Sequence, residues 1–180
     1  MDTSTENVTL CAAFINDVLH VYQDKKAEYP ALFSYAQEYD LSQPFDHVPI
    51  HVYNNICNWI EVNLGKVSTK RLGREIGKTV YNNLQQNKLI SAQPHPHEIM
   101  EALVKVASQM IKDPKRRGWE IREKKAKSVL MRRTQTFNST MQYGLLESLI
   151  FKSGAYSPLV KLVKSVDKGH EYDEYLISWK

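Results

Sequence analysis

The chain has 180 residues, of which 42% are hydrophobic and 24% are charged, and its net charge is +4. This composition is ordinary for one soluble domain, and the length suffices for a core that needs no metal or disulfide. We predict a single domain over residues 1–180. The first residues are polar and acidic, unlike a signal peptide, and no segment approaches the about 18 consecutive apolar residues of a membrane span. We therefore expect a cytoplasmic protein without a membrane span.

The charges are distributed unevenly along the chain. Residues 1–48 contain eight acids and two lysines, whereas residues 112–133 contain ten basic residues and three acids. Regions of opposite charge can orient a charged partner or a second copy of the chain, which makes a homodimer one expectation. Two well-solvated surfaces explain the same pattern, so both interpretations stay open.

Apolar residues at helical spacing predict that the first part of the chain is helical. The first helix runs from Val8 to Lys26, and Pro30 begins a short second helix. The prolines of residues 42–49 indicate a loop. A further helix then runs from about Ile50 to Leu64, and Gly65 ends it.

The next helix begins at Ser68, a good N-cap residue, and contains Gly73 and Gly77 one turn apart. Each glycine costs about 1 kcal/mol of helix propensity relative to alanine. The pair therefore indicates close approach of another backbone or of a ligand, and we favour close helix packing. A last helix of this part spans Ile99 to Ile111 and ends before Asp113 and Pro114.

The hydrophobic period changes to two after Gly118, which predicts two strands around Trp119 and Val129 joined by a lysine-rich turn. A helix follows from Met141 and ends at Gly154. Residues 157–166 fit a helix or a strand, and we assign a strand because a turn and a second alternating segment follow them.

The predicted fold class is α+β. It consists of an N-terminal helical part, residues 8–112, followed by a four-stranded antiparallel sheet with one inserted helix, residues 118–180. The two cysteines, Cys11 and Cys57, lie at apolar helical positions, which is typical of buried reduced thiols. They form no redox or zinc motif.

Four stretches carry a resemblance to known domains. They read Arg71-Leu-Gly-Arg74, Gly118-Trp-Glu-Ile121, Tyr143-Gly-Leu-Leu146 and Tyr175-Leu-Ile-Ser-Trp179. In this order they resemble the H-NOX (heme nitric-oxide-binding) and vinyl-reductase-type small-molecule-binding domains, a superfamily that also includes subunits of the TRAPP vesicle-tethering complex. The resemblance implies an H-NOX-like or TRAPP-subunit-like fold and a role as a sensor or adaptor.

The resemblance also implies what a heme-binding member contains: an iron-ligating histidine on the helix before the first strand, and a Tyr-x-Ser-x-Arg triplet in the second strand for the heme propionates. Here the helix over 99–111 has no histidine, and residues 128–134 lack the triplet. We therefore expect no heme and no other cofactor. A heme-based sensor of NO or O2, with a displaced ligand such as His97 or His20, is the alternative.

Other relatives carry two cysteines beside the last hairpin, where this chain has Ser165 and Asp173, so we expect no thiolate metal site there. Prolines interrupt both short histidine pairs, and we expect them to bind no metal. Nucleophile-elbow, phosphate-loop and dinucleotide motifs are missing from the sequence. We therefore expect no catalytic residues and no enzymatic activity.

The basic segment defines a basic patch, whose side chains could neutralise phosphates. Its members are Lys115, Arg116, Arg117, Arg122, Lys124, Lys125, Lys127, Arg132 and Arg133. Trp119 is the only aromatic residue in the segment 112–133, which disfavours stacking on bases. We favour an acidic protein partner over nucleic acid, which stays an alternative, and a patch without a specific role stays open as well.

The sequence predicts a non-catalytic sensory or regulatory module that binds a protein partner or a small apolar ligand. We expect a ligand pocket between the helical part and the sheet, where the resemblance places the cofactor of heme-binding relatives. The pocket residues are Tyr53, Cys57, Met100, Leu103, Val104, Phe137 and Met141. Apolar walls with a few polar groups suit a lipophilic ligand, and methionines make such a site adaptable. The same side chains could instead fill the core.

Overall fold

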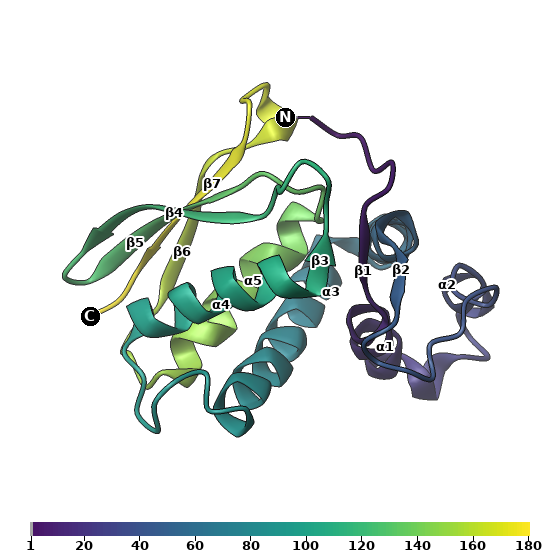
Figure 1. The fold of residues 1–180 in the computed structure, drawn as a ribbon, viewed down its shortest axis with the longest axis horizontal. Helices are drawn as coiled ribbons and strands as arrows, with labels where there is room; N and C mark the ends of the chain where they lie inside the picture. The colour runs from purple at the N-terminus through teal and green to yellow at the C-terminus, as the bar shows by residue number, and fades with distance from the viewer. Residues whose placement is uncertain (1) are drawn as a thin grey trace.

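The computed structural model describes residues 2–180 and shows an α+β arrangement. The helices are α1 (Ala12–Val21), α2 (Pro30–Ser34), α3 (Ile50–Gln86), α4 (Pro96–Met110) and α5 (Ser139–Lys152), with short 3₁₀ turns η1 (Gln23–Lys25) and η2 (Val166–Lys168). The strands are β1 (Thr9–Cys11), β2 (His47–Pro49), β3 (Ile111–Lys112), β4 (Trp119–Lys125), β5 (Ser128–Arg133), β6 (Leu159–Lys164) and β7 (Asp173–Ser178). In Figure 1, α1 and α2 lie on the opposite side of the molecule from the sheet of β4 to β7, with α3, α4 and α5 between them.

The main sheet has the strand order β4-β5-β7-β6, and all its neighbours are antiparallel. Val129 and Met131 of β5 share a buried face with Tyr175 and Ile177 of β7. The helix α5, inserted between β5 and β6, contacts both β6 and β7. The predicted fold class, a helical part followed by a four-stranded antiparallel sheet with one inserted helix, is therefore confirmed. Assigning residues 157–166 to a strand was also correct for Leu159–Lys164.

A second, three-stranded sheet with the order β2-β1-β3 was not predicted. Residues 9–11 form a strand where the sequence predicted helix, and residues 47–49 form a strand within the predicted loop. In the central strand β1, Leu10 is fully buried and lies opposite Val48 and Ile111. Strands of two or three residues are too short to show a period of two, so only their pairing reveals them.

The helix predicted to end at Gly65 does end there, and a second helix follows it to Gln86, so α3 consists of two helices that meet at a kink. Gly65 alone leaves the helical conformation, with φ 81° and ψ 164°, and produces a kink. Glycine tolerates this left-handed φ because it lacks a Cβ atom. The predicted N-cap role of Ser68 was wrong, because its hydroxyl donates back to the carbonyl oxygen of Leu64 at 2.8 Å. Within residues 2–180, no helix is long and apolar enough to cross a membrane.

The close helix packing indicated by the glycine pair is confirmed. A Cβ atom on Gly73 would lie 2.1 Å from the carbonyl oxygen of Met141, and one on Gly77 would lie 2.7 Å from Cβ of Ser148. From α5, Gly144 makes the reciprocal approach, 2.1 Å from the carbonyl oxygen of Lys70. The order of these contacts shows that the second half of α3 and α5 run in the same direction, with their backbones almost touching.

Candidate functional site

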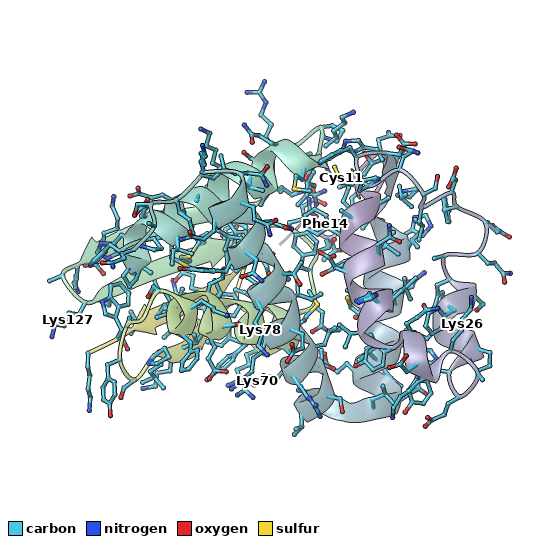
Figure 2. All side chains as sticks on the ribbon, turned by 90° about the horizontal axis from the view of Figure 1, so that it is seen from below. Cys11, Phe14, Lys26, Lys70, Lys78 and Lys127 are labelled. Atoms are coloured by element: carbon cyan, nitrogen blue, oxygen red, sulfur yellow. The ribbon has the colours of Figure 1, made fainter. Side chains whose placement is uncertain are left out.

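Four of the predicted pocket residues meet in one buried region, which we call the α3–α5 seam. It consists of Tyr53 and Cys57 of α3, Phe137 before α5, Met141 of α5, and Phe14 of α1. The Tyr53 hydroxyl donates to Sδ of Met141 at 3.3 Å, and Sγ of Cys57 lies 3.7 Å from the same sulfur. The Tyr53 and Phe137 rings pack edge to face with centroids 5.5 Å apart. Phe14 stacks on Phe137 at 6.5 Å, and Figure 2 shows it pointing from α1 toward the centre of the molecule.

The other three predicted pocket residues lie on α4, which contacts β4 and α5. Met100 is fully buried, Leu103 is almost completely buried, and Val104 is half-buried. Met100 and Leu103 belong to the same hydrophobic core as Tyr53, Cys57, Phe137 and Met141, and Val104 packs against it. The structure thus shows direct contacts among the α3 and α5 members and places the α4 members in the core that they share.

The seam is neutral as well as apolar. Burial raises the pKa of the Cys57 thiol to about 12, and burial also raises the pKa of the Tyr53 hydroxyl well above its usual value. Both groups therefore keep their protons at neutral pH and act as hydrogen-bond donors. The thioether of Met141, a weak acceptor, is the group that receives both contacts.

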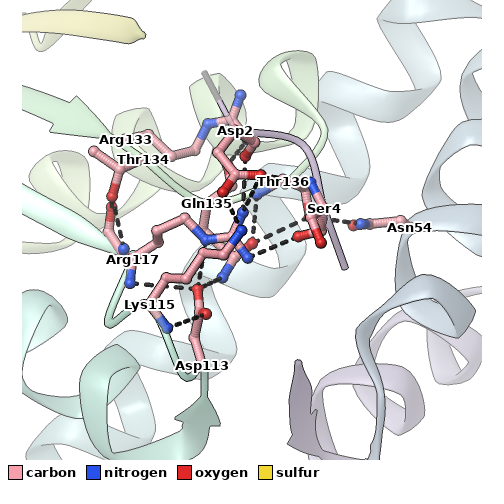
Figure 3. Close-up of polar contacts among 11 residues, drawn as sticks. Asp2, Ser4, Asn54, Asp113, Lys115, Arg117, Arg133, Thr134, Gln135 and Thr136 are labelled. Carbon is pink, nitrogen blue, oxygen red and sulfur yellow. Dashed lines mark hydrogen bonds and ion pairs between the residues drawn. The ribbon is translucent and has the colours of Figure 1, made fainter. Parts of the chain in front are cut away.

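A polar network connects the N-terminal segment to the loop between β3 and β4 (Figure 3). Nε of Arg117 donates to Oδ2 of Asp113 at 2.7 Å, and Gln135 donates to the same oxygen at 2.7 Å. The other guanidinium nitrogens of Arg117 donate to the backbone oxygens of Asp2 and Ser4, each at 2.7 Å. Burial alone would raise the pKa of Asp113, but the hydrogen bonds from Arg117 and from the Lys115 amide outweigh burial and lower it. This network fastens residues 2–4 to the loop.

Arg133 was predicted to belong to the basic patch, and the structure corrects this because the residue is only 2% exposed. Its guanidinium group pairs with the buried carboxylate of Asp173 and donates to the Ser139 hydroxyl at 3.0 Å. The hydroxyl of Tyr175 also lies 3.4 Å from the Asp173 carboxylate. The Nε atom of Arg133 has no hydrogen-bond partner within residues 2–180. The alternation of β5 indicated that Arg133 is buried, because Arg133 lies on the same inward face as Val129 and Met131.

The remaining basic patch is largely neutralised by neighbouring acids. Its ion pairs are Lys115 with Asp2, Arg117 with Asp113, Arg122 with Glu120, Lys124 with Glu101, Lys125 with Glu123, and Arg132 with Glu174. In the described part of the chain, only Arg116 and Lys127 of the patch form no ion pair. A surface of this kind offers little uncompensated charge for a phosphate backbone.

The histidines considered as displaced iron ligands lie outside the seam. His97 lies at the start of α4, where Nε2 is 3.1 Å from the Ser128 carbonyl oxygen and the ring packs 5.1 Å from Trp179. His20 is exposed on α1. Nowhere in residues 2–180 do three or more His, Cys, Asp or Glu side chains form a group that could hold a metal ion.

No family model and no curated protein matches this sequence. Solved structures do match. An H-NOX protein from S. oneidensis in the Fe(II)NO state has a TM-score of 0.72 and 9% identity, with coverage of 95% of this chain and 99% of that chain. A structure from a study of heme distortion in the H-NOX family has a TM-score of 0.69 and 12% identity, with 95% of each chain covered. Fe(II) unliganded H-NOX from K. algicida has a TM-score of 0.61 and 11% identity, with 95% and 97% covered.

These matches correct the prediction that the chain takes no cofactor, because the solved proteins that match it are H-NOX proteins studied through their heme iron. The donor chemistry of the seam fits such a group. Proteins hold heme iron through His, Cys, Met or Tyr side chains, and three of these types meet at Met141, Cys57 and Tyr53. The expectation of no heme rested on the missing histidine of residues 99–111 and the missing propionate triplet, and only histidines, His97 and His20, were considered as displaced ligands. At 95% coverage of its length, the chain has the fold of H-NOX domains.

Proposed function

We propose that this chain is a sensory module that holds heme in the α3–α5 seam, with Met141 as a ligand of the iron. The observation that carries this proposal is the grouping of three side chains of iron-ligand type, Tyr53, Cys57 and Met141, in an apolar, buried region, where iron would take the place of the two hydrogen-bond donors at the Met141 sulfur. The H-NOX fold supports it, since two of the matching H-NOX proteins are described by the ligation state of their Fe(II), and a third comes from a study of heme distortion.

Met141 is the preferred ligand because a thioether binds iron without losing a proton. Cys57 would have to bind as a thiolate, and its pKa of about 12 makes that form costly at neutral pH. Tyr53 faces the same difficulty, since burial raises the pKa of its hydroxyl. Both are therefore assigned as hydrogen-bond donors within the seam.

The packing of the seam suggests how a ligand could be sensed. The seam is filled by its own side chains, and a planar ligand of heme size requires the stacked rings of Phe14 and Phe137 to separate. Phe14 belongs to α1, whereas Phe137 immediately precedes α5. Binding of such a ligand in the seam would therefore move α1 relative to α5 and the sheet. Bound heme would supply an iron atom able to take up a diatomic gas.

Reconstitution of the full chain with hemin tests the proposal. We expect a Soret band with one heme per chain, and we expect Met141→Leu to change the position of the band and weaken heme retention. Phe14→Ala removes one of the two stacked rings and should strengthen binding. His97→Ala and His20→Ala are matched controls that should leave the spectrum unchanged. A chain that takes up no stoichiometric heme, or a Soret band that His97→Ala abolishes, would contradict the proposal.

The output of the module is proposed to be a protein contact and not a catalytic step. A homodimer stays a prediction that follows from the uneven charge of the sequence, and the local ion pairs of the basic patch leave apolar contact to supply most of its affinity. Sedimentation at tens of micromolar protein tests it. A monomer at low salt would contradict the dimer and leave the heme proposal untouched.

A further inference from the structure

The main sheet has an outer face that no helix of residues 2–180 covers. The helices that pack on its strands are α4 and α5, and Figure 1 shows both on the same side of β4 to β7. Along β5, the inward residues Val129 and Met131 are buried, whereas Leu130 between them is half-buried. On the edge strand β6, Leu159 points outward and is 54% exposed. The outer face therefore presents apolar side chains to solvent, which is typical of an interaction surface.

Three rows of side chains cross the outer face in the strand order β4, β5, β7 and β6. The first row is Glu120, Arg132, Glu174 and Lys164, the second is Glu123, Leu130, Leu176 and Lys161, and the third is Lys125, Ser128, Ser178 and Leu159. The charges of the first row alternate in sign and are joined within the chain, where Arg132 and Lys164 both pair with Glu174. The three rows hold three acids and four basic residues, so the face suits neither a strongly acidic nor a strongly basic partner.

The charges at the two ends of the second row are separated within one chain. Glu123 lies on the edge strand β4 and pairs with Lys125 of the same strand at 3.0 Å. Lys161 lies on the opposite edge strand β6, is exposed, and forms no ion pair within residues 2–180. Three strand spacings, or about 14 Å, separate the two residues. They cannot meet within one molecule, and only another molecule can bring them together.

A two-fold axis parallel to the strands makes this face complementary to itself. Such an axis reverses the strand order of the second copy, so that β4 faces the β6 of the other molecule and β5 faces its β7. Glu123 then lies opposite Lys161 of the second copy, and Leu130 lies opposite Leu176. In the first row, each acid likewise lies opposite a basic residue. Packed sheets keep their strand directions within about 30° of each other, which is the arrangement that this axis produces.

From this self-complementary pattern we propose that the outer face of the main sheet binds a second copy of the chain, face to face and with the strands aligned. The leucines of the second row and Leu159 supply most of the affinity, and the charges fix the orientation. Four strands about 20 Å long cover about 400 Å² on each copy, so the contact belongs to the small, weak class of interfaces. The proposal rests on the homodimer predicted above and names its surface, and it is independent of heme.

Reversing the charge at either end of the second row tests the proposal. Glu123→Lys and Lys161→Glu should each weaken the dimer by about tenfold or more, because two like-charge contacts replace two opposite-charge contacts in each homodimer. An equimolar mixture of the two variants should regain the affinity of the wild type. In the mixed dimer, the introduced lysine of one variant faces the introduced glutamate of the other, and the second contact is native. Sedimentation at low salt and tens of micromolar protein measures all four samples.

Lys78→Glu is the matched control, because it reverses an exposed lysine on α3, away from the sheet. It should leave the dimer unchanged. Circular dichroism of each variant establishes that it is folded. A dimer that neither reversal weakens uses another surface, which overturns this proposal and keeps the homodimer. Weakened variants that do not recover on mixing also overturn it. A monomeric wild type removes both the homodimer and this surface, whereas heme uptake, read in the same samples, stands or falls separately.

Discussion

Gly73 of α3 lies so close to α5 that a Cβ atom at this position would be 2.1 Å from the carbonyl oxygen of Met141. Real carbon and oxygen atoms do not approach to this distance, so the two helices can pack as they do only if residue 73 is glycine. Met141 is also the residue on which Tyr53 and Cys57 converge. The glycine contact therefore fixes the position of the backbone that carries the proposed iron ligand.

Gly73→Ala should destabilise the protein by about 1 to 3 kcal/mol, because the added methyl group forces the two backbones apart. Gly144→Ala should have a similar effect, since its Cβ would lie 2.1 Å from the Lys70 carbonyl oxygen. Urea unfolding measures the loss of stability in both variants. Gly118→Ala is the control: its Cβ would meet nothing within 4 Å, and a change above about 0.5 kcal/mol there would show that glycine loss itself matters.

Asp173→Asn should cost about 3 to 5 kcal/mol at neutral pH, because it leaves the buried charge of Arg133 without its counter-ion. Glu123→Gln is the matched control. It removes an exposed pair with Lys125 at 3.0 Å and should cost less than about 1 kcal/mol. Equal losses in the two variants would contradict the buried-pair interpretation.

The stabilisation from Asp173 should also depend on pH. Burial alone would raise the pKa of this carboxyl, but the charge of Arg133 and the hydrogen bond from Ser139 outweigh burial and hold the pKa below 3.8. A carboxyl with a lowered folded-state pKa stabilises the fold above its unfolded pKa and loses this effect as pH falls through the folded value. The difference in unfolding free energy between wild type and Asp173→Asn should therefore be constant above about pH 5 and shrink below about pH 4. A difference that grows in acid would contradict it.

The sequence contained enough information for the long elements and little for the short ones. Helical spacing continued over α4 and α5 for several turns, and the alternation of β5 and β7 was visible because each strand has six residues. The three-residue strand β1 has no measurable period, and its identity depends on partners at residues 47–49 and 111–112.

The candidate site was partly visible for the same reason. Tyr53 and Cys57 are one helical turn apart, which places them on one face, but their contact with Met141 joins residues more than 80 positions away. The pairing of Asp113 with Gln135 depends on the same kind of tertiary placement. No local pattern encodes such contacts. The close packing of α3 on α5 was visible in the sequence, because the glycine pair costs helix propensity and this cost requires a compensating close approach.

Cys57 should make the protein less stable in alkaline solution. Its folded-state pKa is about 12, whereas an exposed thiol loses its proton near pH 8.5, so between these values the unfolded chain is the one that ionises. Stability should fall as pH rises above about 9, by at most about 1.4 kcal/mol per pH unit from this group. The difference in unfolding free energy between wild type and Cys57→Ala should shrink over pH 8 to 10. A difference that stays constant over this pH range would show that folding does not keep the thiol protonated.

Nucleic acid should bind this chain only weakly, although residues 112–133 carry ten basic groups. Lys124 and Lys125 are engaged by Glu101 at 2.6 Å and Glu123 at 3.0 Å. Because each neutralised phosphate requires a free cation, we expect a Kd weaker than about 100 µM for labelled DNA or RNA at physiological salt, measured by fluorescence anisotropy.

The double variant Glu101→Gln and Glu123→Gln should bind more tightly and with a steeper dependence on salt, because it releases both lysines from their partners. Lys78 provides the control, since it pairs with Glu75 at 2.9 Å on α3, far along the chain from the patch. Glu75→Gln should leave the affinity unchanged. Micromolar binding by the wild type would show that the ion pairs open in solution, and it would restore the basic patch as a nucleic-acid surface.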